Sequence, residues 1–170
     1  MEQLNRKSVE EFKESKKNPV IAVLENIRSA YNVGSVFRTA DAFLIESIYI
    51  TGYTAKPPHK EITKTALGAQ ETVDWNYFST TKEAIEDLRK NEYKVFAVEQ
   101  VTDSISLETI HNLSFEKIAF IFGNEVAGVD QKIISFCDGC VEIPQFGMKH
   151  SLNISVAAGI VLWEAVKNKK

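Results

Sequence analysis

Short apolar runs and amphipathic segments alternate along this chain. The apolar runs have the length of buried strands, and the amphipathic segments have helical spacing. Ser8 followed by Glu11 has the form of a capping box, which predicts that the first helix begins there. The predicted strands are 20–24, 47–51, 93–98, 118–122 and 141–143. The predicted helices are 8–17, 33–43, 62–67, 81–91, 130–136 and 151–167.

Strands that alternate with helices predict an α/β fold with a parallel sheet flanked by helices on both faces. Buried strands without polar alternation, such as 20–24, fit that arrangement. No internal repeat, low-complexity segment or long linker divides the 170 residues. We therefore expect a single domain over residues 1–170, in which residues 1–18 form a short basic helical extension.

The composition is that of a globular protein, with 44% hydrophobic and 25% charged residues. No segment approaches the roughly 18 unbroken apolar residues of a membrane span. The first residues lack the apolar core of a secretion signal. These features predict a cytoplasmic protein that makes no membrane contact.

The two cysteines, Cys137 and Cys140, have the spacing of a redox pair or of half a zinc site. A zinc site of this type needs a second pair, which the chain lacks. A thioredoxin-like pair follows a strand and opens a helix, whereas this pair closes a predicted helix and precedes a strand. We expect reduced structural thiols and no bound metal.

The net charge of −3 is unusual for a nucleic-acid enzyme, whose common signature is a basic patch. Lysine and arginine residues do cluster at the two ends of the chain, although such clusters are most often solvated helix faces. If the two ends lie side by side, or if a dimer doubles them, these clusters form a track for RNA. The clusters are Arg6, Lys7, Lys13, Lys16 and Lys17 at one end and Lys167, Lys169 and Lys170 at the other.

Three polar motifs interrupt the apolar pattern. Residues 32–38 read Asn-x-Gly-x-x-x-Arg, and residues 123–128 read Gly-Asn-Glu-x-x-Gly. Residues 143–155 read Ile-Pro-x-x-Gly-x-x-x-Ser-Leu-Asn-hydrophobic-Ser. Singly, they fit a helix cap with a surface arginine, a glycine turn and a capped helix. The second motif lacks the Gly-Lys-Ser/Thr of a phosphate loop and the close glycines of a dinucleotide fingerprint. Because the second and third follow predicted parallel strands, they mark a ligand pocket at the carboxyl edge of the sheet.

In this order the three motifs resemble the SpoU (TrmH) branch of the SPOUT RNA methyltransferases, from about Pro19 to the C-terminus. The resemblance implies methyl transfer from S-adenosyl-L-methionine to a ribose 2′-hydroxyl of structured RNA. It favours tRNA over rRNA, because compact members of the family often act on tRNA. It also implies a homodimer and a deep C-terminal trefoil knot that involves about residues 120–170. General topology rules and periodicity do not predict such a knot.

The resemblance also assigns roles to single residues. Arg38 is the family's proposed general base, but a guanidinium stays charged in proteins, so gripping an RNA phosphate and stabilising the developing alkoxide is the alternative. If Asn32 lies in the loop before its helix, it faces one cavity together with Arg38. The matching catalytic positions are Asn32, Arg38, Glu125, Ser151 and Asn153. The matching cofactor-binding positions are Phe122, Gly123, Asn124, Gly128, Ile143, Leu152 and Asn153.

Several alternatives stay open. The chain is also compatible with a catalytically silent knotted RNA-binding protein, a nucleotide-binding α/β module, or base methylation as in other SPOUT branches. His150 has a side chain suited to proton transfer, although the family motif does not require it. The side chain of Tyr31 either helps to hold an RNA base or only packs against its neighbours. The small residues Ala157, Ala158 and Gly159 suit close helix packing, between subunits or within one chain.

Overall fold

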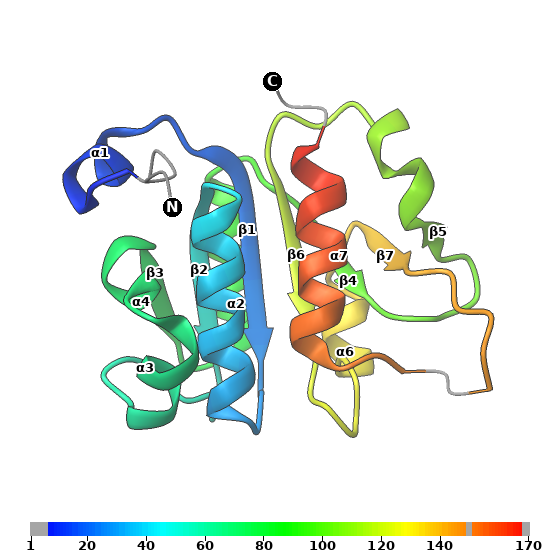
Figure 1. Ribbon diagram of the computed structural model, residues 1–170. Helices are drawn as coiled ribbons and strands as arrows, with labels where there is room; N and C mark the ends of the chain where they lie inside the picture. Colours follow the sequence, from blue (N-terminus) through cyan, green and yellow to red (C-terminus); the bar gives the residue numbers. More distant parts are fainter. Residues whose placement is uncertain (1–6, 149–150, 168–170) are drawn as a thin grey trace.

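The computed structural model describes residues 7–148 and 151–167 (Figure 1). Within these residues seven strands form one sheet, in the order β3-β2-β1-β6-β4-β7-β5, and all neighbouring strands run parallel. The α/β class with a parallel sheet is confirmed. The strands are β1 (Asn18–Glu25), β2 (Ile45–Thr51), β3 (Trp75–Phe78), β4 (Lys94–Val98), β5 (Ile105–Ser106), β6 (Ile118–Phe122) and β7 (Gly139–Glu142).

The central strands owe their place to continuous apolar sequence. Every residue of β6 is buried, as are residues 20–25 of β1, because helices cover both faces of the sheet there. The pattern did not predict β3 and β5. β3 forms one edge of the sheet and β5 the other. They are four and two residues long, and both are half-exposed. Such short edge strands need little hydrophobic sequence, so they carry little signal.

Helices cover both faces of the sheet, as predicted. One hydrophobic core joins the sheet to α2, α3, α7 and η1, and a second joins the opposite face to α5 and α6. No helix in the described residues is long and apolar enough to span a membrane. The helices are α1 (Val9–Glu14), α2 (Ala30–Ala42), α3 (Lys60–Ala66), α4 (Ala69–Thr72), α5 (Thr81–Lys90), α6 (Gln131–Ile134) and α7 (Ile154–Val166), with the 3-10 helix η1 (Leu107–Asn112).

Capping residues set the helix starts, and the starts of α2, α3 and α7 differ from the predicted ones. The capping box of Ser8 and Glu11 is present as predicted. The predicted start of α2 at residue 33 is too late, because Ser29 is its cap and its hydroxyl accepts the N–H of Asn32 at 3.3 Å. Asn153, not Ser151, caps α7. Several cap-forming residues stand close together in both places, so the choice among them depends on tertiary contacts.

The last helix, α7, packs against α2 and η1. The ring of Trp163 lies 5.6 Å from that of Phe43, and Ala158 is fully buried in the chain's own core. For Ala158 the intrachain role is therefore the one observed. Val156, Ile160 and Trp163 remain 50%, 39% and 54% exposed. Their spacing of four and three residues places them on one face of the helix, which we call the α7 stripe.

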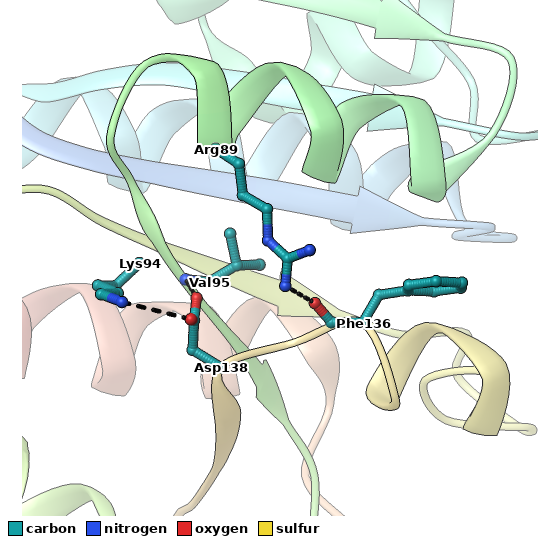
Figure 2. Close-up of polar contacts among 5 residues, drawn as sticks. All are labelled: Arg89, Lys94, Val95, Phe136 and Asp138. Carbon is teal, nitrogen blue, oxygen red and sulfur yellow. Dashed lines mark hydrogen bonds and ion pairs between the residues drawn. The ribbon is translucent and has the colours of Figure 1, made fainter.

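The connection between α6 and β7 is tied to β4 and α5 (Figure 2). The carboxylate of Asp138 accepts the backbone N–H of Val95 at 2.8 Å and lies 3.5 Å from Nζ of Lys94. Arg89 donates a hydrogen bond to the carbonyl of Phe136. These contacts hold the start of β7 in place beside β4.

The two cysteines flank Asp138 and are free thiols. Cys140 is buried, and Cys137 donates to the carbonyl of Ile133 at 3.3 Å. Burial raises the pKa of Cys137 to about 12. A protonated, buried thiol is unreactive at neutral pH, which fits the predicted structural role.

Lys17 and Lys167, from the two basic ends of the chain, lie at the amino edge of the sheet. Lys17 directly precedes β1, and Lys167 follows α7, which runs antiparallel to β1 (Figure 1). Lys17 lies over the Phe12 ring, and Lys167 pairs with Glu164 at 2.5 Å. Ligand sites at the carboxyl edge are therefore out of reach of these lysines within one chain. Arg6, Lys169 and Lys170 lie outside the described residues.

Candidate functional site

A pocket of about 380 Å³ opens at the carboxyl edge of the sheet. The neighbouring strands β6, β4 and β7 end there, and the loops that follow them line the pocket together with the start of α7. Parallel α/β sheets bind ligands at this edge. The volume lies within the roughly 300–1,000 Å³ that is usual for small-molecule sites.

The pocket gathers most of the predicted cofactor positions. Glu125 and Ser151, predicted as catalytic, line it as well. Asn153 does not line it, although its neighbours Leu152 and Ile154 do. The predicted cofactor positions in the lining are Phe122, Gly123, Asn124, Gly128, Ile143 and Leu152.

The loop at 123–128 is closed by its own backbone. Asn124 and Gly128 exchange two hydrogen bonds of 3.1 and 2.9 Å. Gly128 has φ +70°, and a Cβ there would lie 2.4 Å from the carboxylate of Glu99, which accepts the N–H of Val129. Only glycine combines this conformation with so close a neighbour.

The side chain of Asn124 holds the loop rather than facing a ligand. Its Nδ2 donates to the carbonyl of Asn26 at 2.9 Å and to the hydroxyl of Tyr53 at 2.8 Å. Its Oδ1 accepts the N–H groups of Val126 and Ala127, both at 2.9 Å. Because an amide has only two N–H donors, none is left for a ligand. Its backbone N–H is likewise taken by the carbonyl of Gly128, so Asn124 shapes the pocket wall and offers a ligand no free N–H.

Glu125 joins this loop to the start of α2. It accepts the backbone N–H groups of Arg28 and Ser29 at 2.8 and 3.1 Å and the amide of Asn32 at 3.0 Å. Burial acts to raise the pKa of Glu125, but these hydrogen bonds together outweigh it and hold the pKa below its ordinary value. The carboxylate is ionised at neutral pH, and the helix dipole favours a negative charge there. Glu125 is thus a fixed anion rather than a proton carrier.

Asn32 carries the hydrogen-bond network to the third motif. Its Oδ1 accepts from Nδ2 of Asn153 at 3.3 Å. Oδ1 of Asn153 in turn accepts the N–H and the hydroxyl of Ser155 at 2.9 and 2.6 Å. The network Glu125–Asn32–Asn153–Ser155 therefore unites residues from all three polar segments.

Ser155 lines a second hollow, between α2, α3 and α7, which we call the basic groove. Arg38 and Lys64 line it from α2 and α3, and both are exposed. Among the described residues, neither cation has a hydrogen-bond or ion-pair partner. Two cations without a carboxylate make the groove suited to an anion. The other lining residues are Ser35, Thr39, Thr65, Ser155 and Val156.

The pocket has the opposite charge, and we call it the acidic pocket. Glu99, Glu125 and Glu142 line it, and no lysine or arginine of the described residues does. Glu99 and Glu125 accept backbone N–H groups. The side chain of Glu142 has no hydrogen-bond or ion-pair partner within the described part of the chain, so it is available to a cationic ligand.

Sequence reasoning missed three charged residues of the two hollows, namely Glu99, Glu142 and Lys64, and it assigned no role to Ser155, the last residue of the third motif. A signal existed for the two glutamates. Glu99 directly follows β4 and Glu142 ends β7, so each stands at the carboxyl end of a strand, as Glu125 does beyond β6. Lys64 carried no such signal, because it belongs to an ordinary helix, whereas the signal for Ser155 was its place at the end of the third motif.

The structure does not bring all five predicted catalytic residues together. Asn32, Glu125 and Asn153 are hydrogen-bonded, whereas Ser151 lies on the pocket wall and Arg38 in the basic groove. Asn32 lies within α2, not in the loop before it. Six residues of helix separate it from Arg38 by about 9 Å along the axis and about 120° around it. We expected Asn32 and Arg38 to face one cavity only if Asn32 lay in the loop before the helix. Because Asn32 lies within the helix, that expectation does not apply.

The histidines in the described residues are peripheral. Nδ1 of His59 caps α3 by accepting the N–H of Glu61 at 3.2 Å. His111 lies 3.9 Å from Glu164. His150 lies outside the described residues. Within the described part of the chain, no group of three or more histidine, cysteine or acidic side chains is placed to hold a metal ion.

Comparison with known proteins identifies the family of the chain. Residues 19–163 match the SpoU rRNA Methylase family. The chain is 29% identical over 168 residues to a 23S rRNA (guanosine-2′-O-)-methyltransferase of Haemophilus influenzae, covering 98% of this chain and 67% of that protein. It is 27% identical over 164 residues to a tRNA (guanosine(18)-2′-O)-methyltransferase of Thermus thermophilus, covering 96% and 82%.

The fold is likewise shared with solved structures. The AdoMet-bound rRNA methyltransferase from Sinorhizobium meliloti superposes with a TM-score of 0.81 at 26% identity. The match covers 92% of this chain and 59% of that one, so this chain spans little more than half of that protein. Family match, motif order and fold agree, and the chain belongs to the SpoU rRNA methylase family.

Proposed function

We propose that this protein transfers a methyl group from S-adenosylmethionine to a ribose 2′-hydroxyl of structured RNA. The observation that carries this is the hydrogen-bond network from Glu125 to Ser155. It joins a pocket suited to a cationic small molecule to a groove suited to a phosphate backbone. The two relatives named above, described as guanosine 2′-O-methyltransferases of rRNA and tRNA, support it.

The acidic pocket fits S-adenosylmethionine. That molecule combines a flat aromatic base with a positively charged sulfonium, and it supplies an electrophilic methyl group when bound. Ile143 and Leu152 offer apolar surface to the base, and Glu142 offers a free carboxylate to the cation. A phosphate-bearing nucleotide fits less well, because no cation of the described residues lines the pocket. This disfavours the nucleotide-binding module.

The basic groove fits the RNA backbone. Arg38 is placed to hold a phosphate through two parallel hydrogen bonds and to stabilise the oxyanion that forms on the ribose. Glu125 and Asn32 fix the start of α2, the helix that carries Arg38. Holding the hydroxyl in line with the methyl group supplies much of the remaining rate. We assign Arg38 this anchoring role in preference to that of a general base.

The test is methyl transfer from labelled S-adenosylmethionine to unmodified tRNA and rRNA pools, followed by nucleoside analysis. Label in a 2′-O-methylnucleoside is the expected result. The accepting pool decides between tRNA, which the sequence favours, and rRNA; the relatives are divided between the two. Label in a base instead contradicts ribose methylation. Bound cofactor without any transfer points to a missing partner or to a silent RNA-binding protein.

We also propose a homodimer formed through the α7 stripe. Three large apolar side chains on one helical face, all more than a third exposed, are typical of a surface that another protein covers. A second copy of the chain is the partner implied by the family resemblance. Sedimentation at micromolar concentration should show a dimer, and Ile160→Asp, at the centre of the stripe, should give a monomer. A monomeric wild type contradicts this proposal.

The trefoil knot over about residues 120–170 is likewise a proposal. The segment that joins β4 to β6 runs outside β7, because β5 is the edge strand beside it. η1 of the same segment packs against α7. This arrangement supports a path in which the chain from β7 to α7 passes inside that segment. Pulling both ends of one molecule tests it, because a knotted chain stops short of the roughly 3.6 Å per residue of a free chain.

A further inference from the structure

Two exposed tyrosines lie at the carboxyl edge of the sheet, one just beyond β2 and one in β3, and neither the cofactor nor the phosphate proposal uses them. Tyr53 follows β2 and is 65% exposed, and Tyr77 lies in β3 and is 41% exposed. The hydroxyl of Tyr77 donates to the carbonyl of Gly52 at 3.0 Å, so the two tyrosines are neighbours. Aromatic side chains contribute most when buried, and two exposed together indicate a contact surface.

Hydrogen bonds hold Tyr53 at its backbone N–H and at its side-chain hydroxyl. Its N–H donates to Oδ1 of Asn26 at 3.2 Å, and its hydroxyl accepts from Nδ2 of Asn124 at 2.8 Å. The same Nδ2 donates to the carbonyl of Asn26 at 2.9 Å. The ring is therefore fixed against the loop that carries Glu125. A ring fixed in advance loses little conformational entropy when a ligand stacks on it.

The turn that presents Tyr53 uses two unusual backbone conformations. Gly52 has φ +63°, and a Cβ there would lie 1.9 Å from Oδ1 of Asn26. Asn26 itself has φ +51°. Non-glycine residues adopt such conformations at a cost in free energy. Because the Tyr53 ring is largely exposed, packing in the protein's own core does not explain why the turn adopts these two costly backbone conformations.

Cations lie close to the two rings, although Glu46 and Glu61 flank the segment that supplies them. Residues 47–60 contain Lys56, His59 and Lys60 and no aspartate or glutamate. Nζ of Lys56 lies 3.6 Å from the ring centroid of Tyr77. Exposed aromatic rings among cations are the composition of surfaces that bind single-stranded nucleic acid. There, bases stack on the rings and cations meet the backbone.

We infer that Tyr53 and Tyr77 form a stacking platform for unpaired nucleotides next to the one that is methylated. This inference rests on the proposed function. The bond from Tyr53 to Asn124, the neighbour of Glu125, places a stacked base beside the acidic pocket. Proteins that recognise RNA by sequence commonly take unpaired bases and stack them on aromatic side chains. The platform supplies affinity that the net charge of −3 does not.

The test measures RNA affinity at one salt concentration with two probes, unmodified bulk tRNA and a single-stranded oligoribonucleotide. Tyr53→Ala is expected to weaken binding of both probes about 10-fold, because it removes the stacking ring. Tyr53→Phe keeps the ring and loses only the hydroxyl, and it should stay within about threefold of wild type. The affinity for S-adenosylhomocysteine should be unchanged in both variants.

Phe136→Ala is the matched control, because this partly exposed ring packs near α5 on the opposite face of the sheet. It should leave RNA affinity unchanged, and thermal unfolding of every variant checks the fold. Wild-type affinity in Tyr53→Ala overturns the platform. An equal loss in Tyr53→Ala and Tyr53→Phe also overturns it, because the bond to Asn124 is then responsible.

Failure of the proposed function looks different from failure of the platform. A wild-type protein that binds RNA but transfers no methyl group contradicts the proposed function alone, and the affinities of the Tyr53 variants still decide about the platform. A wild-type protein that binds neither probe overturns both.

Discussion

The acidic pocket and the basic groove lie on either side of α7 and differ in charge. The pocket has three glutamates and no lysine or arginine among its described lining residues. The groove has Arg38 and Lys64 and no carboxylate among those that line it. The difference matches the two proposed substrates, a cationic methyl donor and an anionic RNA. A chain of net charge −3 can thus bind RNA, because local potential rather than net charge acts at the contact.

The wall between the two hollows is the first turn of α7. Ile154 and Ala157 line the pocket, and Ser155 and Val156 line the groove. Successive residues of a helix are about 100° apart, so one short segment serves both sides. The hydrogen-bond network from Glu125 to Ser155 crosses this wall. The same few residues that separate the substrates therefore also set the geometry between them.

The largest effect is expected from Arg38→Lys, on the groove side. A lysine keeps the charge but loses the bidentate geometry, so methyl transfer should slow by about 100-fold. S-adenosylhomocysteine affinity should not change, because Arg38 does not line the pocket. Single-turnover transfer of labelled methyl groups and calorimetric titration give the two values. Near-wild-type turnover contradicts the bidentate role.

On the pocket side, Glu142→Gln tests charge without changing shape. The affinity for S-adenosylmethionine should fall about 10-fold, because a partly solvated charge pair is lost. S-adenosylhomocysteine lacks the sulfonium charge and serves as the control, with a change of less than about twofold. Titration calorimetry measures both. Equal losses for the two ligands would show that shape, not charge, is responsible.

Between the two hollows, Glu125→Gln should lower the free energy of unfolding by about 1 kcal/mol at pH 7. The folded state lowers the pKa of Glu125, so its contribution is present above the unfolded value of about 4.3. It is lost as the pH falls through the lower, folded value. Urea unfolding across this range should show wild type and variant converging in acid.

A matched control for this experiment is Glu86→Gln, on the exposed surface of α5. Its ion pair with Lys82 is solvated, so little change is expected at any pH. A gap between wild type and Glu125→Gln that stays constant down to acid pH would contradict the role of Glu125 as a fixed anion.

The smallest effect is expected from Lys64→Ala in the groove. RNA affinity should fall about threefold, and the slope of log affinity against log salt should shrink by about 0.7–0.9, the value of one phosphate contact. Lys90→Ala removes an equal charge from α5, across the sheet, and should leave the slope unchanged. Filter binding at several salt concentrations gives the slopes. An unchanged slope for Lys64→Ala removes this lysine from the RNA contact.

Much of the fold was predictable from local signals. The strand at 118–122 has the predicted bounds, and the capping box at Ser8 is in place, because apolar runs and caps act over a few residues. β3 and β5 were missed, since a short edge strand needs little apolar sequence. The pocket position of Glu125 was predictable, because it lies in the loop just beyond the end of a buried strand.

What the sequence by itself determined is which segments are buried and which short motifs carry amide, hydroxyl and charged groups. Both follow from contacts between near neighbours along the chain. Only the tertiary structure decided that Glu99, Glu125 and Glu142 share one pocket and that Arg38 and Lys64 share a groove. The first depends on the order β6-β4-β7, and the second on α7 packing against α2. These contacts join residues far apart in the chain, and no local periodicity specifies them.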